Sequence, residues 1–224
     1  SPDSKLAAYF FNETGSFADY VLKVKDLTAG KDLAFSVKGA SSVAWANDNK
    51  TLFYSVIDPI TLRSYRVYRQ SIDGGKAELV YEEKDEKFST GVSATKTREW
   101  IMMESSSSTT SECRLLPADK PMDAFEVFTQ RVQDVDYDVA SHKDFFFIRY
   151  KDKKNLNGKI YQVAKAEFKN RSAWREIVAH SDDARIENLI VQKDYIVIET
   201  RKNGLNEFEV RSLKTGKSRF VSFP

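Results

Sequence analysis

The sequence predicts an all-β protein built from short strands that recur along the chain. Three observations lead to this prediction: an internal repeat with a spacing of 45 residues, apolar runs that alternate with period two, and the lack of a helical stripe in longer windows. A repeat of roughly 40–50 residues that carries about four short strands is the spacing of a β-propeller blade. The predicted architecture is therefore a β-propeller of four-stranded blades.

The repeat is clearest between the first 33 residues and the segment 45 positions later. The identical pairs at this offset are Asp3/Asp48, Lys5/Lys50, Tyr9/Tyr54, Tyr20/Tyr65, Gly30/Gly75 and Lys31/Lys76. Later copies are weaker but keep the same layout of turn, apolar run, polar loop and second run. We expect about five blades, at residues 1–40, 41–84, 85–133, 134–183 and 184–224.

The units of the repeat contribute well-marked runs rich in Val, Ile, Tyr and Phe, as strands are. The first runs are 50–56, 97–103, 143–150 and 193–200. The second runs are 20–27, 65–72, 112–118, 159–168 and 208–213. In residues 20–27 the side chains of Val21, Lys23 and Lys25 share one face, and Leu22 and Val24 share the other, which predicts a half-buried strand.

Three similar turns, "LTAGK" at 27–31, "IDGGK" at 72–76 and "LKTGK" at 213–217, invite a phosphate-binding interpretation. The repeat favours another: the glycines allow a positive φ in equivalent hairpins, and the lysines are exposed. The P-loop pattern also fails, because Arg211 stands where its first glycine is required.

No motif for catalysis, a cofactor or a metal stands out. Ser93 lies in Gly91–Thr95, which lacks the second glycine of a nucleophile elbow, so we expect an ordinary strand or turn residue. The two histidines, His142 and His180, lie in turn-like contexts, where we expect surface residues. A metal site at His180 with the neighbouring Asp182 and Asp183 lacks further ligands. We therefore predict no catalytic, cofactor-binding or metal residue in this chain.

Two polar stretches leave alternatives open. The segment "VYEEKDEKF" at 80–88 concentrates Glu82, Glu83, Asp85 and Glu86, which we expect at a solvated strand edge, or alternatively facing the channel, where they attract basic peptides. The stretch "SSSSTT" at 105–110 predicts an exposed flexible loop. The aromatic residues of the apolar runs are expected in the core; these are Trp45, Phe53, Tyr54, Trp100, Phe145, Phe146 and Phe147.

Bulk composition restricts the partners and the compartment. The 35 Lys and Arg against 33 Asp and Glu give a net charge of +2 without a basic block, so nucleic acid is not implied. A single cysteine, Cys113, fits a reducing, cytoplasmic location, and no segment has the length of a membrane span or the pattern of a signal peptide. The missing initiator methionine suggests a segment of a longer protein.

Several stretches, in this order, resemble the N-terminal propeller of oligopeptidase B, a branch of the prolyl oligopeptidase family. They include "SPDSKLAAYF", "VAWANDNKTLFY", "LVYEEKDEKF", "SSSSTTSECRLLPAD", "VDYDVASHKDFFFIRY" and "ARIENLIVQKDYIVIETRKNGLNEFEV", and they cover essentially the whole chain. The "VYEEKDEKF" and "TTSE" elements, the latter at Thr109–Glu112, are the most specific.

The resemblance implies a cytosolic serine peptidase in which a seven-bladed propeller covers an α/β-hydrolase domain carrying the Ser, Asp and His triad. Members cleave short peptides after Arg or Lys. About five of the seven blades are present here and the hydrolase domain is absent, so no catalytic residue is carried over. The implied partners are that domain and short basic peptides.

Two functions remain open at this point: a noncatalytic gating propeller of such a peptidase, or an autonomous propeller that serves as a protein-interaction scaffold. Self-association of an incomplete ring through its open sheet edges is a third, weaker hypothesis.

Overall fold

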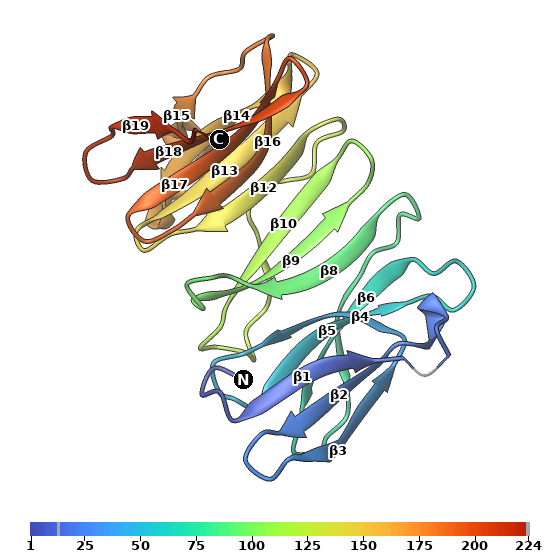
Figure 1. The fold of residues 1–224 in the computed structure, drawn as a ribbon. Coiled ribbons are helices and arrows are strands. Elements are labelled where there is room, and N and C mark those ends of the chain that lie inside the picture. Colours follow the sequence, from blue (N-terminus) through green and yellow to red (C-terminus); the bar gives the residue numbers. More distant parts are fainter. Residues whose placement is uncertain (13, 223–224) are drawn as a thin grey trace. The chain divides into compact units, whose positions relative to one another are not determined.

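The computed structural model describes residues 1–12 and 14–222, which fold almost entirely into β-strands (Figure 1). Within these residues the strands form five antiparallel sheets in chain order. The all-β prediction is therefore confirmed, and so is the expected presence of about five sheets. The first sheet has three strands rather than four, because β1 (Leu6–Phe11) aligns through the 45-residue repeat with β5 (Thr51–Ile57), the second strand of the next sheet.

The first sheet contains β1, β2 (Val21–Asp26) and β3 (Lys31–Lys38). The second contains β4 (Ala40–Trp45), β5, β6 (Ser64–Ser71) and β7 (Glu78–Glu82), and the third contains β8 (Ser89–Ala94), β9 (Trp100–Ser106), β10 (Ser111–Pro117) and β11 (Glu126–Val127). The fourth contains β12 (Asp136–Ser141), β13 (Phe145–Asp152), β14 (Asn155–Ala164) and β15 (Arg175–Val178). The fifth contains β16 (Ala184–Val191), β17 (Tyr195–Lys202), β18 (Leu205–Ser212) and β19 (Ser218–Phe220). Three 3-10 turns are η1 (Phe17–Asp19), η2 (Lys165–Glu167) and η3 (Arg171–Ala173).

The chain divides into two compact units, which we describe separately. Unit 1 comprises Ser1–Ser108 and Cys113–Val127, and it holds the first three sheets. Unit 2 comprises Thr109–Glu112 and Phe128–Pro224, and it holds the fourth and fifth sheets. Each sheet is a meander in which strands that follow one another along the chain are hydrogen-bonded neighbours, so that every internal connection is a hairpin.

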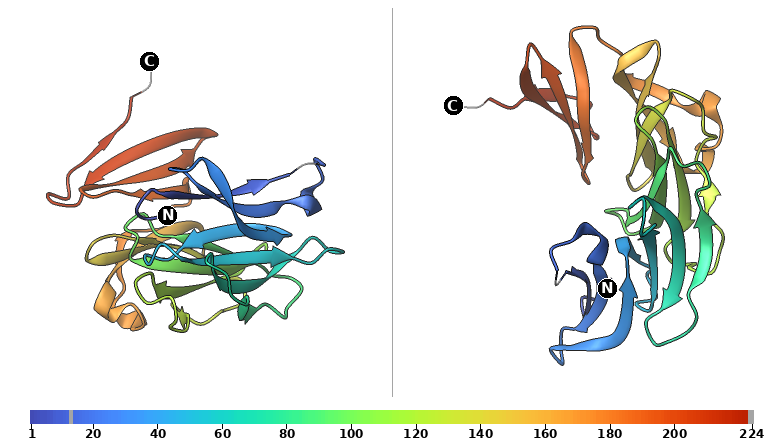
Figure 2. Two further views of the ribbon diagram at one scale, coloured as in Figure 1. Left: turned by 90° about the horizontal axis from the view of Figure 1, so that it is seen from below. Right: turned by 90° about the vertical axis from the view of Figure 1, so that its right-hand side faces the viewer.

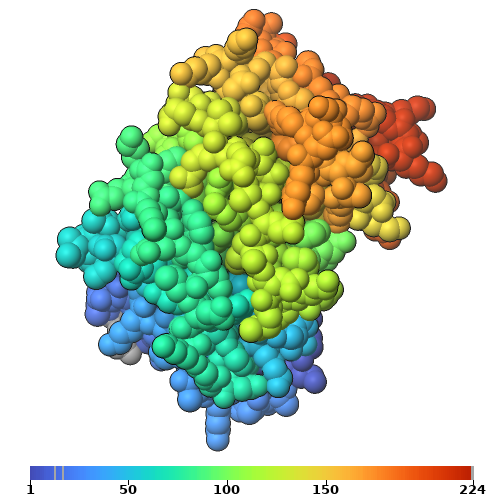
Figure 3. Space-filling view, turned by 180° about the vertical axis from the view of Figure 1, so that it is seen from behind, coloured from blue at the N-terminus to red at the C-terminus, as the bar shows by residue number. Residues whose placement is uncertain are grey.

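Neighbouring sheets within a unit bury their faces against each other. In unit 1 one core lies between the first and second sheets and includes Leu22, Val24, Phe35, Leu52 and Tyr54. A second core lies between the second and third sheets and includes Phe53, Val67, Val92, Ile101 and Leu116. In the space-filling view the green surface of the third sheet adjoins the cyan surface of the second (Figure 3). In unit 2 the core between its two sheets includes Phe147, Ile160, Ile186, Ile196 and Ile198.

Strand periodicity explains these cores. Successive side chains of a strand point to opposite faces, so Leu52 and Tyr54 enter one core and Phe53 enters the other. The half-buried pattern predicted for β2 is confirmed, because Leu22 and Val24 are fully buried and the other face carries Lys23 and Lys25. The core prediction for the aromatic residues is confirmed for four of them and only partly met by Trp45, Trp100 and Phe145, which are half-buried. The four buried ones are Phe53, Tyr54, Phe146 and Phe147.

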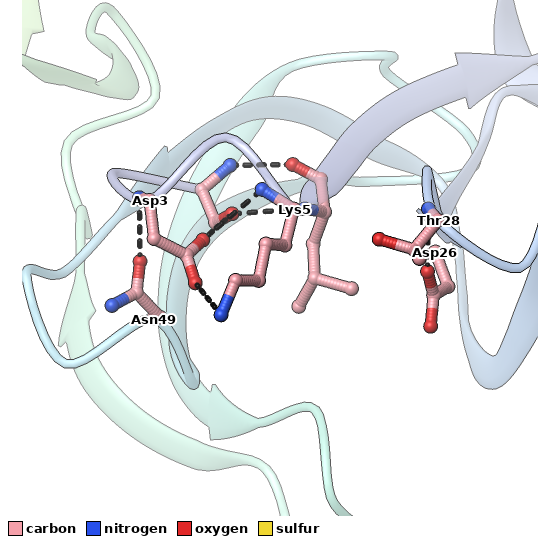
Figure 4. Close-up of polar contacts among 7 residues, drawn as sticks. Asp3, Lys5, Asp26, Thr28 and Asn49 are labelled. Carbon is pink, nitrogen blue, oxygen red and sulfur yellow. Dashed lines mark hydrogen bonds and ion pairs between the residues drawn. The ribbon is translucent and has the colours of Figure 1, made fainter.

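The repeat is visible in single hydrogen bonds. Asp3 Oδ1 accepts a hydrogen bond from the backbone N–H of Lys5 at 3.2 Å (Figure 4). Asp48 Oδ1 likewise accepts one from the backbone N–H of Lys50 at 2.9 Å. The next residue of each turn has a positive φ, 61° at Ser4 and 60° at Asn49. The backbone N–H of Asp3 also donates to Asn49 Oδ1 at 2.9 Å, so the copies of this turn in the first two sheets contact each other.

The three Gly-Lys turns are hairpins, as predicted. Gly30, Gly75 and Gly216 all have a positive φ, of 69°, 127° and 69°. At Gly30 the turn is completed by Asp26, whose Oδ1 accepts hydrogen bonds from the backbone N–H groups of Thr28 and Ala29, and Thr28 is shown in Figure 4. The lysines of the three turns, Lys31, Lys76 and Lys217, are exposed.

Gly30 offers a direct test of the conformational requirement. A Cβ at this position has no heavy atom within 4 Å, so a substitution changes backbone strain without a clash. We expect Gly30→Ala to lower the free energy of unfolding by about 1 kcal/mol, and Gly30→Asn by less, because Asn tolerates the left-handed region better than Ala. Urea denaturation of both variants checks this order, and equal stability of Ala and Gly at position 30 would contradict it.

Candidate functional site

The histidines that most resembled catalytic groups in the sequence contact a backbone oxygen and a carboxylate. Ser93 is an exposed residue of β8 in unit 1, whereas both histidines belong to unit 2. His142 makes its hydrogen bond through Nε2 to the backbone oxygen of Lys193 at 2.9 Å, and His180 Nδ1 lies 3.8 Å from Asp182 Oδ1. Neither of these contacts joins a histidine to a nucleophile, as general-base catalysis requires.

A metal site is not supported either. The Asp182 side chain is 98% exposed, and no group of three or more His, Cys, Asp or Glu side chains that could hold a metal lies within residues 1–12 and 14–222. Likewise, no helix in the described part of the chain is long and apolar enough to cross a membrane.

The acidic segment at 80–88 forms the end of β7 and the connection from β7 to β8. The Arg63 guanidinium donates hydrogen bonds to three backbone oxygens of this segment, those of Glu83, Asp85 and Phe88, the last at 2.8 Å. Glu82 is paired with Arg66 at 2.8 Å. The expectation of a solvated edge is wrong for Glu83, which is only 5% exposed and accepts a hydrogen bond from the Tyr81 hydroxyl at 2.8 Å.

The stretch at 105–110 was expected to be exposed throughout, and this is wrong at both ends. Ser105 lies on β9 and is fully buried, and Thr110 is 1% exposed. Thr110 Oγ1 accepts a hydrogen bond from the backbone N–H of Asp134. Ser106, Ser108 and Thr109 between them are exposed.

The "TTSE" element is held by hydrogen bonds inside unit 2. The Ser111 hydroxyl donates to the backbone oxygen of Tyr137 at 2.9 Å and accepts from its N–H at 2.7 Å. Thr109 donates to Asp134 Oδ1 at 3.0 Å, and Lys153 Nζ lies 2.9 Å from Asp134 Oδ2. Hydrogen bonds from Lys153, Gln133 and Thr109, in this order, lower the pKa of Asp134 to about 2.

The surface of unit 1 with the strongest signs of an interaction site is the end at which the chain passes from one sheet to the next. We call it the crossover end; it comprises residues 12 and 14–20 between β1 and β2, Gly39, the β5–β6 turn (58–63) and the β7–β8 connection (83–88). A hydroxyl network stiffens it. The Ser42 and Ser55 hydroxyls lie 2.5 Å apart, Ser42 accepts a hydrogen bond from the N–H of Val92, and Ser64 donates to the oxygen of Thr90.

Large apolar side chains are open to solvent at this end. Phe10 is 36% exposed, Tyr20 38%, Leu62 40% and Ile60 90%. The Phe10 and Tyr20 rings meet edge to face at 6.4 Å and line a cavity of about 220 Å³, together with Ala40, Ser41 and Ile57. A cluster of exposed aromatic and aliphatic side chains beside an apolar cavity is typical of a surface that another protein surface covers.

Comparison with known proteins gives the family. The family whose model matches the chain is the prolyl oligopeptidase N-terminal β-propeller domain, and the match covers residues 1–224. The chain belongs to this family. The predicted propeller fold and the resemblance to the prolyl oligopeptidase family are therefore confirmed.

Two curated relatives are much longer than this chain. Dipeptidyl aminopeptidase BI of Pseudoxanthomonas mexicana is 32% identical over 213 residues, which cover 94% of this chain and 29% of that protein. Protease 2 of Moraxella lacunata is 26% identical over 213 residues, which cover 93% of this chain and 30% of that protein. The chain thus spans about a third of the length of the relatives it matches.

The structure of oligopeptidase B from Leishmania major has the same fold, with a TM-score of 0.87 at 24% identity, covering 98% of this chain and 32% of that chain. Oligopeptidase B from Trypanosoma brucei with covalently bound antipain, in its closed form, matches with a TM-score of 0.80 at 21% identity, covering 97% of this chain and 33% of that chain. This propeller domain therefore forms one part of larger peptidase chains.

Arg63 provides a test of how the crossover end is held. Arg63→Met removes the donor of three backbone oxygens, whereas Arg66→Met removes an ion pair whose side chains are 40% and 33% exposed. We expect Arg63→Met to lower the free energy of unfolding by about 2 kcal/mol and Arg66→Met by less than about 1 kcal/mol. Both residues lie over the Tyr65 ring, so the pair is matched in that contact. Equal losses in urea denaturation would contradict the proposed role of Arg63.

Asp134 should make unit 2 sensitive to acid. Its pKa is lowered in the folded state to about 2, so its contribution to stability is present above the ordinary value of 3.8 and is lost as the pH falls from about 4 towards 2. We expect the urea midpoint of Asp134→Asn to be lower than that of the wild type at pH 6, and the difference to shrink steadily below pH 4. The exposed Asp183 in the same unit serves as the control, because Asp183→Asn should leave the midpoint nearly unchanged at pH 6.

Proposed function

We propose that this chain is the noncatalytic propeller portion of a serine oligopeptidase, in which it limits the access of peptides to a separate α/β-hydrolase domain of the same parent protein. The observation that carries the proposal is the family match over residues 1–224 together with the short coverage of the relatives, which leaves room for a catalytic domain elsewhere in the parent.

The crossover end of unit 1 is the surface on which we place the hydrolase domain. In the second and third sheets the first strand starts and the fourth strand ends at this end, so connections to other parts of a protein leave from here. The exposed Phe10, Tyr20 and Ile60 give this end an apolar character that suits a domain interface. The hydroxyl network and the Arg63 hydrogen bonds supply the rigidity that a gate needs, since a flexible rim excludes large substrates poorly.

We further propose that the parent cleaves short basic peptides after Arg or Lys in the cytoplasm. Support comes from the likeness to protease 2 and to the oligopeptidase B structures, and the single buried cysteine suits a reducing compartment. The acidic segment at 80–88 gives little support, because Glu83 is buried and Glu82 is paired with Arg66. The selectivity for basic residues is therefore assigned to the hydrolase domain.

One observation favours a second type of peptide cleavage: the relative at 32% identity is named a dipeptidyl aminopeptidase. The parent would then release dipeptides from the amino terminus instead of cutting within a peptide. The scaffold hypothesis has less support, since the family match joins this chain to peptidases.

The parent protein, expressed from its complete coding sequence, tests these proposals. We expect it to cut an internal Arg or Lys bond in an amino-terminally acetylated peptide and to leave the same sequence intact within a folded protein, whereas this 224-residue chain alone should cut neither. Mass spectrometry of the products distinguishes the modes. Release of dipeptides only from peptides with a free amino terminus would replace the endopeptidase proposal, and rapid cleavage of the folded protein would remove the gating proposal.

A further inference from the structure

An aromatic box in unit 2 encloses the side chain of Arg171. The Arg171 Cζ atom lies 3.8 Å from the ring centre of Trp174, 4.4 Å from that of Tyr150 and 5.0 Å from that of Tyr161. Tyr150 and Tyr161 come from the adjacent strands β13 and β14 and meet edge to face at 5.8 Å. Trp174 directly follows η3 and is 7% exposed. Aromatic faces that surround a cation on several sides are the usual means of binding guanidinium and ammonium groups.

The charge of Arg171 is satisfied by these rings and not by a carboxylate. In the part of the chain that the structure describes, Arg171 forms no ion pair, although Glu176 lies close along the chain. The Glu176 carboxylate is instead 2.9 Å from Lys159 Nζ. The Arg171 side chain is exposed, so its guanidinium can leave the box towards solvent without crossing the core. The box thus has the chemistry of a cation receptor with an occupant that belongs to the same chain.

The turn that carries Arg171 lies outside the strands and is held at both ends. Phe168 stacks on Phe128 at 5.0 Å, and the Trp174 indole donates a hydrogen bond to the backbone oxygen of Phe168 at 2.9 Å. These contacts fix both ends of the turn Lys169–Ala173. Inside the turn the backbone hydrogen bonds are local, such as those from Ala173 to Asn170 and from Trp174 to Arg171. Figure 2 shows the two short helical turns η2 and η3, in orange, at the margin of unit 2.

From this geometry we infer that the box formed by Tyr150, Tyr161 and Trp174 is a binding site for the arginine side chain of a basic peptide or protein segment, and that Arg171 is an internal ligand which the incoming side chain displaces. The inference is independent of the proposed peptidase function, because it rests on the contacts within unit 2 alone.

The attachment of Arg171 to the chain limits the affinity of the wild-type box for a free arginine side chain. A group held on a short flexible linker competes at an effective concentration of about millimolar, so a single free arginine derivative must reach that range to displace Arg171. Removing the Arg171 side chain leaves the rings in place and removes the competitor. We therefore expect Arg171→Ala to bind an arginine derivative about tenfold more tightly than the wild type, or better.

The experiment is a titration of the 224-residue protein with Nα-acetyl-arginine amide, followed by the indole N–H resonance of Trp174 in NMR spectra and assigned with Trp174→Phe. Nα-acetyl-citrulline amide, which has nearly the same shape without the charge, serves as the ligand control. Arg175→Ala serves as the protein control, because it removes a neighbouring arginine outside the box.

We expect the Trp174 resonance of Arg171→Ala to shift with the arginine derivative and not with the citrulline derivative, and Arg175→Ala to behave as the wild type. Equal affinity of Arg171→Ala and the wild type overturns the inference, and so does equal binding of citrulline. If Arg171→Ala does not fold, Arg171→Gln keeps a side chain of similar polarity without the charge and is judged by the same two comparisons.

Discussion

The structure depends on the burial of both faces of each inner sheet. The second sheet has no polar face: on β5 the side chains of Leu52 and Tyr54 enter the core shared with the first sheet, and Phe53 enters the core shared with the third. Burial of apolar surface is the dominant favourable term in folding, and a sheet that is apolar on both sides obtains it only when a neighbour covers each side. This requirement explains the repeat in the sequence, because each sheet must offer apolar surfaces that match those of its neighbours.

Between these apolar sheets, a polar contact recurs at equivalent positions of the repeat. The Ser64 hydroxyl donates to the backbone of Thr90, and Ser111 and Tyr137, each 47 positions further along, make the same contact with two hydrogen bonds. Another 47 positions on, the residue is Gly158, where an added Cβ would lie 3.6 Å from that of Ile186 and φ is +87°. A small residue thus occupies this position of the third strand in the second, third and fourth sheets, and the hydroxyls of Ser64 and Ser111 there satisfy backbone groups.

Sequence reasoning predicted the strands that repeat along the chain and missed the side-chain contacts that occur only once. The strands around Phe53, Phe147 and Ile196 follow from period two and the 45-residue offset, both of which are local signals. The burial of Glu83 and Thr110 could not be foreseen, because it depends on partners such as Arg63 and Asp134, 20 and 24 positions away, whose proximity the fold creates. The aromatic box had no signal at all, since Tyr150 and Arg171 are separated by 21 positions and no spacing rule links a strand to the turn that follows the next one.

A TM-score of 0.87 at 24% identity shows how few individual side chains this architecture demands. The shared requirement is apolar residues on alternating positions, and many sequences meet it. Function must therefore be sought where side chains are not explained by packing within the sheets. Ile60, 90% exposed on a turn, and the Phe10 and Tyr20 rings at the same end of unit 1 are open to solvent. Their exposure is the reason for which we place the hydrolase domain at the crossover end.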